Sequence, residues 1–150
     1  GLDVFASGGN EIVSAAKALK KKKLLGFLAD QDGYIHGLPV PFLGQPSSAV
    51  VGPATFAKKF GSPVVPIFTS RKPEGGHIVH ILPPLHYNNS GDDDVDMYTL
   101  TEECVRVTED FIREHPDEWI WFQHRWMTKM SEIVDYYKKL EIRERAHEKQ

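Results

Sequence analysis

The stretch Leu24-Leu25-Gly26-Phe27-Leu28-Ala29-Asp30-Gln31-Asp32 predicts the fold around which the rest of the chain is arranged. Residues 24–29 are apolar or glycine without alternation, which is typical of a strand covered on both faces of a sheet. Two carboxylates then end the run. Because ligands of open α/β sheets bind beyond the carboxyl ends of strands, Asp30 and Asp32 are candidates for a functional site. Aspartate is also favoured in turns for purely local reasons, so the pattern alone leaves both interpretations open.

The composition is that of one globular domain, and it argues against several classes of protein. Hydrophobic residues make up 41% and charged residues 26% of the 150, which is ordinary for a folded domain. The net charge of −3 gives no general attraction to nucleic acid, so no nucleic-acid partner is expected. The single cysteine, Cys104, excludes an internal disulfide and a cysteine zinc site. Because no apolar run approaches ~20 residues, the sequence predicts neither a membrane-spanning helix nor a signal peptide.

Helical and strand patterns alternate along the chain. Helices are predicted from the cap Asn10 to about residue 19, from Pro53 to Gly61, and from a capping box of Thr99 and Glu102 to His115. Strands are predicted over residues 1–9, 24–29, 64–68 and 77–82. This succession with short connections predicts an α/β fold, in which a partial, mainly parallel sheet is flanked by helices.

Three further segments have an unusual composition. Four adjacent lysines at residues 20–23 follow the first helix, where cations suit the helix dipole, although four exceed what a cap requires. The aromatic segment at residues 119–126 indicates core packing. Residues 131–150 predict a charged C-terminal helix with a thin apolar stripe of Ile133, Tyr137 and Leu140.

Several short blocks occur in order along the chain. They are residues 26–32 with Gly37 and 40–44, Gly52-Pro53-Ala54 leading to 60–66, 81–85, Ile112-Arg113, Pro116, Trp119, Trp121 and His124-Arg125-Trp126. The ordered set resembles the lipid A biosynthesis lauroyl/myristoyl acyltransferase family, a branch of the glycerol-phosphate acyltransferase superfamily. The resemblance implies that residues 1–128 are the C-terminal portion of an acyltransferase domain and that residues 129–150 are a helical extension.

The resemblance also implies a reaction. In the family an acyl group passes from acyl carrier protein, or from acyl-CoA, to a hydroxyl of a lipid A precursor at the cytoplasmic face of the bacterial inner membrane. A histidine acts as general base, oriented by an acidic residue five positions later. None of the seven histidines here has that partner. The resemblance therefore implies that the catalytic pair and a membrane anchor lie upstream in a longer protein, and that this chain alone is inactive.

Six residues are candidates for substrate binding: Asp30, Gln31, Asp32, Gly37, Arg71 and Arg125. A guanidinium binds phosphate in a planar fork, which suits the arginines to a phosphorylated acceptor. Arg71 could equally form a structural ion pair with Asp30 or Asp32. Arg125 stands among tryptophans, where structural stacking is the stronger interpretation. No catalytic residue, metal ligand or cofactor is assigned to this chain.

Carboxylates repel phosphate, so the aspartates are expected to orient an arginine or the acceptor hydroxyls. The stretch Gln123-His124-Arg125-Trp126-Met127 departs from the family's usual His-Arg-Arg-Trp-Lys ending. It lacks one arginine and the lysine, which weakens any phosphate role for this segment. A truncated sheet would also leave an open edge, so self-association of the chain is a further expectation.

Two other functions fit parts of the sequence. Asp30 and Asp32 form an Asp-x-Asp pattern, which in a metal-dependent glycosyltransferase could hold a divalent cation bridging a nucleotide diphosphate. Alternatively, residues 20–23, the aromatic segment and the tail helix could form a membrane-surface interaction module. Basic residues near anionic lipid contribute on the order of 1 kcal/mol each.

Overall fold

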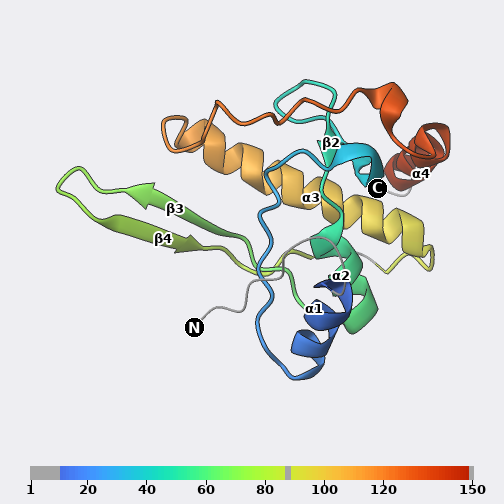
Figure 1. The fold of residues 1–150 in the computed structure, drawn as a ribbon, viewed down its shortest axis with the longest axis horizontal. Coiled ribbons are helices and arrows are strands. Elements are labelled where there is room, and N and C mark those ends of the chain that lie inside the picture. The colour runs from blue at the N-terminus through green and yellow to red at the C-terminus, as the bar shows by residue number, and fades with distance from the viewer. Residues whose placement is uncertain (1–10, 87–88, 149–150) are drawn as a thin grey trace.

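The structure, a computed structural model, describes residues 11–86 and 89–148 (Figure 1). The strand expected over residues 1–9 and the cap expected at Asn10 lie outside the described residues. In chain order the elements are α1 (Glu11–Lys20), β1 (Leu38–Pro39), β2 (Ser48–Ala49), α2 (Gly52–Phe60), β3 (Ile67–Arg71), β4 (His77–Ile81), α3 (Asp93–Glu114) and α4 (Tyr136–Glu148), with short 3₁₀ helices at Tyr34–His36 and Met130–Glu132.

The longest helix, α3, lies at the centre of the core (Figure 1). Val95, Tyr98, Val105 and Ile112 recur at helical spacing and form its buried stripe. The same cluster contains, from other parts of the chain, Leu38, Val40, Phe42, Ala49, Ile142 and Ala146. The central helix therefore joins the segment around β1 to α4.

The opposite side of α3 is covered by α2. Ala54 and Ala57 of α2 pack against Leu100, and α1 packs in turn on α2 (Figure 1). Both predicted ends of α2 are confirmed, because Pro53 occupies its first turn and Gly61 closes it in the left-handed region at φ 61°. The helices thus stack in the order α1, α2, α3.

The start of α3 differs from the prediction, whereas its end agrees. The helix begins two turns earlier than the predicted capping box, because Asp92 is the N-cap and its Oδ1 accepts a hydrogen bond from the Val95 N–H at 3.2 Å. The Thr99 hydroxyl instead donates to the carbonyl of Val95. The helix ends at Glu114 because the residue before a proline is disfavoured in helical conformation, as predicted from His115 and the proline after it.

The predicted parallel sheet is wrong for the described residues. They contain two antiparallel pairs, β1 with β2 and β3 with β4. The β3–β4 hairpin projects from the body of the molecule, with Ile67 opposite Ile81 and Arg71 opposite His77 (Figure 1). Parallel strands need a crossover of a dozen or more residues, and the connection through residues 72–76 is too short for one. The coarser class, a mixture of helices and small sheets, agrees with the prediction.

Residues 24–29 do not form the expected strand. They run from α1 toward Asp30 beside no hydrogen-bonded strand among the described residues (Figure 1). Leu24 is 101% and Leu28 75% exposed, whereas Phe27 packs against Phe56 with ring centroids 5.6 Å apart. A strand requires a neighbour for its backbone groups, and none is present within the described part of the chain.

The C-terminal helix α4 is confirmed, but its buried stripe is not the predicted one. Tyr137 is 80% exposed, whereas Ile142 and Ala146 are buried in the cluster that contains Tyr98. Ile133 is buried but precedes the helix. The proposed division of the chain at residue 128 stays a prediction. Among the described residues, no helix combines the length and apolarity that crossing a membrane requires.

Candidate functional site

The residues Asp30, Asp32, Trp119, Arg125 and Thr128 meet in one place, which we call the aspartate hub. Asp32 is 6% exposed, and both of its carboxylate oxygens accept hydrogen bonds. Its Oδ1 accepts from the Thr128 hydroxyl at 2.6 Å and from the Tyr34 N–H at 2.7 Å. Its Oδ2 accepts from the Thr128 N–H at 3.0 Å. The buried carboxylate is therefore satisfied by the protein itself.

Asp30 makes a second link to the same distant segment. Its Oδ2 accepts hydrogen bonds from the indole N–H of Trp119 at 3.1 Å and from the Gln123 side-chain amide at 3.2 Å. The two aspartates thus attach the turn after residues 24–29 to residues 119–128. Gln31, between them, is exposed, so its side chain faces solvent at the turn.

Arg125 is buried next to these carboxylates with 1% of its surface exposed. Its Nη1 donates to the Ser48 carbonyl at 2.8 Å, and its guanidinium lies 4.4 Å from the centroid of the Phe42 ring. Nε and Nη2 are buried and have no hydrogen-bond partner among the described residues. Burial lowers the pKa of Arg125, and the negative charges of Asp32 and Asp30 oppose that shift.

Aromatic rings enclose the guanidinium. The centroid of the Phe42 ring lies 5.4 Å from that of Trp119 and 5.8 Å from that of Trp126. The Trp126 indole N–H donates to the Phe42 carbonyl at 3.3 Å. Core packing is therefore confirmed for these two tryptophans. Trp121 and Phe122 are exposed, at 49% and 94%. The guanidinium lies over a phenylalanine ring, that of Phe42, rather than over a tryptophan.

Gly37 lies beside the hub, at a point of close backbone approach. A Cβ there would stand 2.1 Å from the Ser48 Oγ and 2.6 Å from the Ala49 carbonyl oxygen, so the position requires a glycine. Its own carbonyl accepts from the Lys139 ammonium at 3.0 Å. Gly37 thus brings the segment before β1 against β2 and receives a contact from α4.

Arg71 lies in the hairpin and has different partners from those expected. The ion pair considered with Asp30 or Asp32 does not form. The Arg71 Nε instead lies 3.1 Å from the Glu118 carboxylate, and Nη2 donates to the Asp117 carbonyl at 3.1 Å. The guanidinium is exposed to solvent. The structure therefore brings together Asp30, Asp32 and Arg125 but holds Arg71 in a separate pair. The substrate-binding roles of all six candidates stay predictions.

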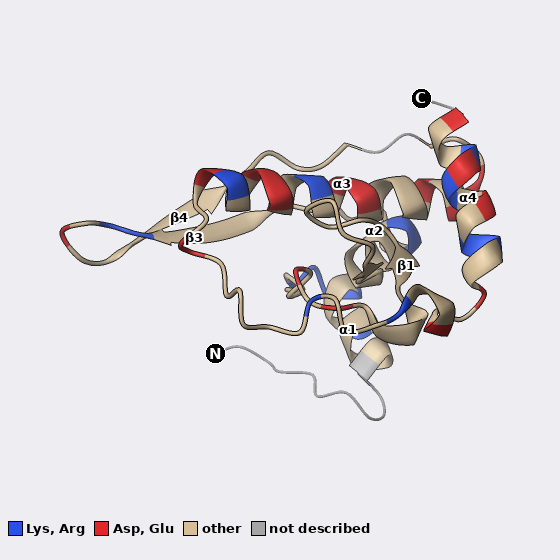
Figure 2. Cartoon of the chain, turned by 90° about the horizontal axis from the view of Figure 1, so that it is seen from above, with Lys and Arg blue, Asp and Glu red and all other residues tan. Residues whose placement is uncertain are grey.

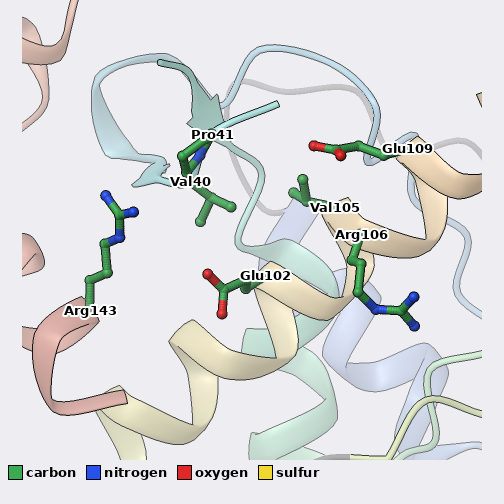
Figure 3. Close-up of a pocket in the computed structure, with 7 residues that line it drawn as sticks. All are labelled: Val40, Pro41, Glu102, Val105, Arg106, Glu109 and Arg143. Carbon is green, nitrogen blue, oxygen red and sulfur yellow. The ribbon is translucent and has the colours of Figure 1, made fainter. Parts of the chain in front are cut away.

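A small cavity of about 220 Å³ lies between α3, α4 and the residues after β1. Sequence reasoning missed it, because its walls come from three separate segments. Glu102 turns its carboxylate toward the side on which α4 carries Arg143 (Figure 3). Within the described residues Arg143 has no salt-bridge partner, so the cavity offers a free guanidinium beside an apolar wall. The lining residues are Val40, Pro41, Glu102, Val105, Arg106, Glu109 and Arg143 (Figure 3).

Comparison with known proteins gives the class of this chain. Residues 1–128 match the family described as bacterial lipid A biosynthesis acyltransferase. The chain therefore belongs to this acyltransferase family. It is similar to the phosphatidylinositol mannoside acyltransferase of Mycobacterium tuberculosis (strain ATCC 25618 / H37Rv), with 24% identity over 135 residues. The alignment covers 88% of this chain and 41% of that relative, so the chain spans about two fifths of the relative's length.

The comparisons do not support the glycosyltransferase alternative. The blocks that contain the Asp-x-Asp pattern are part of the acyltransferase match. In addition, the two aspartates accept hydrogen bonds from Trp119, Gln123, Tyr34 and Thr128. Their placement is explained by these contacts, which hold two segments of the fold together.

Proposed function

We propose that this chain is the C-terminal part of a lipid A biosynthesis acyltransferase that transfers a fatty acyl group from acyl carrier protein or acyl-CoA to a hydroxyl of a lipid A precursor. The observation that carries the proposal is the family match over residues 1–128. In such a transfer the acceptor oxygen attacks the thioester carbonyl, the C–O ester bond forms and the C–S bond breaks. The hydroxyl proton passes through a general base to the leaving thiol.

The general base of this reaction is proposed to lie outside the present chain. No histidine here is followed five positions later by an acidic residue. Within the described residues, His80 comes nearest to a base beside a hydroxyl, because its Nε2 lies 2.8 Å from the Ser70 Oγ. Its ring packs against Phe111 and His115 rather than against a carboxylate. The chain alone is therefore expected to be inactive.

The aspartate hub is proposed to shape the edge at which the acceptor binds. Asp30 and Asp32 hold the turn through buried contacts, and Gln31 between them is left facing solvent. We assign to Gln31 a hydrogen bond with an acceptor hydroxyl, and to the two aspartates the role of positioning residues. Arg125 balances their charge from within the core.

The acceptor is proposed to be a phosphorylated glycolipid presented at the cytoplasmic face of the bacterial inner membrane. The family description names lipid A, and the mycobacterial relative is named for phosphatidylinositol mannoside. Both names denote glycolipids, so the second lipid is an alternative acceptor. The two are distinguished by offering each in turn to the same enzyme.

The test compares a full-length protein containing this chain with the 150 residues alone. Each is given labelled acyl carrier protein or acyl-CoA with a lipid A precursor or with phosphatidylinositol mannoside, and the acylated lipid is measured. The full-length protein is expected to acylate the lipid A precursor, and the chain alone to give no product. Turnover by the chain alone that His80→Ala abolishes would contradict the proposal.

The role of Gln31 is tested in the same full-length protein. Gln31→Ala is expected to raise the KM for the acceptor several-fold with little change in kcat, because it removes a contact made in the ground state as well. Gln45→Ala is the matched control, since Gln45 is also exposed but lies on the loop between β1 and β2. Equal effects of the two changes would count against an acceptor contact at Gln31.

A further inference from the structure

The outer face of α1 and the turn after it form one exposed surface, which we call the lysine surface. It consists of Val13, Lys17, Lys20, Lys21, Lys22 and Leu24. Val13, Lys17 and Lys20 are spaced four and three residues apart and so share one face of the helix. Ala15, on the opposite face of the helix, is buried, and α1 contacts α2. The lysines and the two apolar side chains therefore face away from the core.

The helix does not need these lysines for its end. The Lys23 N–H donates to the Ala18 carbonyl at 3.0 Å and the Lys22 N–H to the Leu19 carbonyl at 2.8 Å, which is the Schellman arrangement. Lys22 stands at φ 58°, a left-handed position that glycine usually occupies. The backbone thus satisfies the last carbonyls, and a lysine is kept where glycine would be easier to accommodate. The excess of lysines calls for another explanation.

Among the described residues, no acidic side chain pairs with the lysines on the outer face of α1 or with Lys21 and Lys22. Acidic residues gather along α3, and α2 separates α3 from α1 (Figure 2). The whole chain carries a net charge of −3. The separation of this cationic patch from the acidic residues gives the molecule an electric dipole. The dipole would orient the molecule at a negatively charged surface.

We infer that the lysine surface docks on an anionic lipid bilayer, with its ammonium groups at the lipid phosphates and Val13 and Leu24 among the headgroups. Val13 is 51% and Leu24 101% exposed, so both can enter the interface without rearrangement of the core. Apolar side chains beside lysines are the pattern of interfacial helices. The alternative partner, single-stranded nucleic acid, is bound through stacked aromatic rings, and this surface contains none.

This inference goes beyond the proposed acyl transfer and does not depend on it. Docking would operate with no donor or acceptor present, since it uses charge and apolar contact alone. A chain that binds vesicles yet belongs to an inactive enzyme, or one that fails to bind yet supports transfer, separates the two proposals.

The test measures sedimentation of the 150-residue chain with vesicles of phosphatidylcholine, with or without phosphatidylglycerol. Binding is expected to the mixed vesicles alone, and to fall in high salt because screening shortens the range of charge attraction. The triple change K17Q/K20Q/K21Q is expected to lower the partition coefficient at least about tenfold, given three lost lysine contacts. V13S/L24S is expected to lower it several-fold and leave its salt dependence unchanged.

The matched control is K59Q/K72Q/K138Q, which removes three exposed lysines elsewhere and changes the net charge equally. It is expected to stay within about twofold of the parent. Circular dichroism confirms that each variant keeps its helices. Equal loss in both triple variants, equal binding to both vesicle types, or binding to polyuridylate without vesicle binding would each overturn the inference.

Discussion

Two regions of this molecule differ in which side chains they bury and which they expose. In the aspartate hub, Asp32 and Arg125 are buried, at 6% and 1% exposure, and hydrogen bonds within the chain satisfy both oxygens of Asp32. On the outer face of the β3–β4 hairpin, Ile67, Val79 and Ile81 are between 59% and 68% exposed. The charged groups of one region are covered by protein, and the apolar groups of the other face solvent.

We call the aspartate hub the complete region, because protein covers its charged groups. We call the outer face of the hairpin the uncovered region, because its apolar side chains have no cover among the described residues. The inner face of the hairpin is covered, because Phe68 stacks on Phe111 of α3 with centroids 4.4 Å apart. Its outer face, like Leu28, is apolar and has no cover among the described residues. Burial of apolar surface yields about 25 cal/mol per Å². On the proposed function, that energy is gained when the rest of the acyltransferase packs against these surfaces.

The strongest test of the complete region removes the Asp32 carboxylate. Asp32→Ala leaves the buried Thr128 hydroxyl and N–H without their acceptor and takes a counter-charge from Arg125. Because uncompensated buried groups are costly, the free energy of unfolding is expected to fall by about 3–5 kcal/mol in a urea titration. Asp94→Ala, an exposed acid in the first turn of α3, is the control and should cost under about 1 kcal/mol. Similar losses in both would show that the buried hydrogen bonds of Asp32 contribute no more stability than an exposed acid does.

The second test adds one methyl group at a point of close approach. Gly37→Ala places its Cβ 2.1 Å from the Ser48 Oγ, so β2 must shift, and we expect a loss of about 1–3 kcal/mol. Gly26→Ala is the matched control, because a Cβ there meets nothing within 4 Å and needs no left-handed φ. The control should be neutral or slightly stabilising by urea titration. Equal destabilisation by both changes would place the tight packing elsewhere.

The same contrast explains what could be predicted from the sequence. Local sequence signals predicted three helix ends correctly. Pro53 lies in the first turn of α2, Gly61 follows its last residue, and α3 ends before His115. Local rules for caps and proline act within a few residues, and the chain itself contains everything that they require. The start of α3 differs from the predicted capping box because the Asp92 side chain caps the helix seven residues before Thr99.

Long-range partners could not be predicted in this way. Two of the donors to Asp30 and Asp32, Trp119 and Thr128, lie 89 and 96 positions away along the chain. Arg71 pairs with Glu118 rather than with either aspartate. Whether residues 24–29 become a strand depends on a neighbour, because backbone pairing and not composition defines a strand. The apolar pattern of residues 24–29 predicted a covered strand, whereas Leu24 and Leu28 are exposed in the structure.

The third test uses the ion pair between α2 and α3. Lys58 Nζ lies 2.7 Å from the buried Asp96 carboxylate. Burial pushes the pKa of Asp96 upward, but hydrogen bonds from Lys58 and Ser90 outweigh it and hold that pKa below its ordinary value of 3.8. A depressed carboxyl pKa contributes stability that is present above pH 3.8 and is lost as the pH falls through the folded-state pKa.

Asp96→Asn is therefore expected to cost about 1–2 kcal/mol at neutral pH and to flatten the loss of stability on acidification below about pH 4. Urea titrations at a series of pH values measure both effects. Asp93→Asn is the control, because Asp93 also pairs with Lys58 but its side chain is 93% exposed, and it should cost under about 0.5 kcal/mol. An acid slope that Asp96→Asn leaves unchanged would contradict the assignment.

The smallest effect is expected on the outer face of the hairpin. Ile81→Thr keeps a β-branched residue in β4 and alters a side chain that is 68% exposed, so the stability of the 150-residue chain should change by less than about 0.5 kcal/mol. Phe68→Thr, on the inner face of β3, should cost more because it removes the stacking with Phe111. In the full-length protein, the difference in destabilisation between Phe68→Thr and Ile81→Thr should be smaller. On the proposed function Ile81 would then be covered, and its replacement would leave a polar group in an apolar contact. Thermal unfolding of both variants, in the chain and in the full-length protein, measures this difference. If Ile81→Thr is equally mild in both contexts, the exposed face is an ordinary surface, and the division between complete and uncovered regions does not extend to the hairpin.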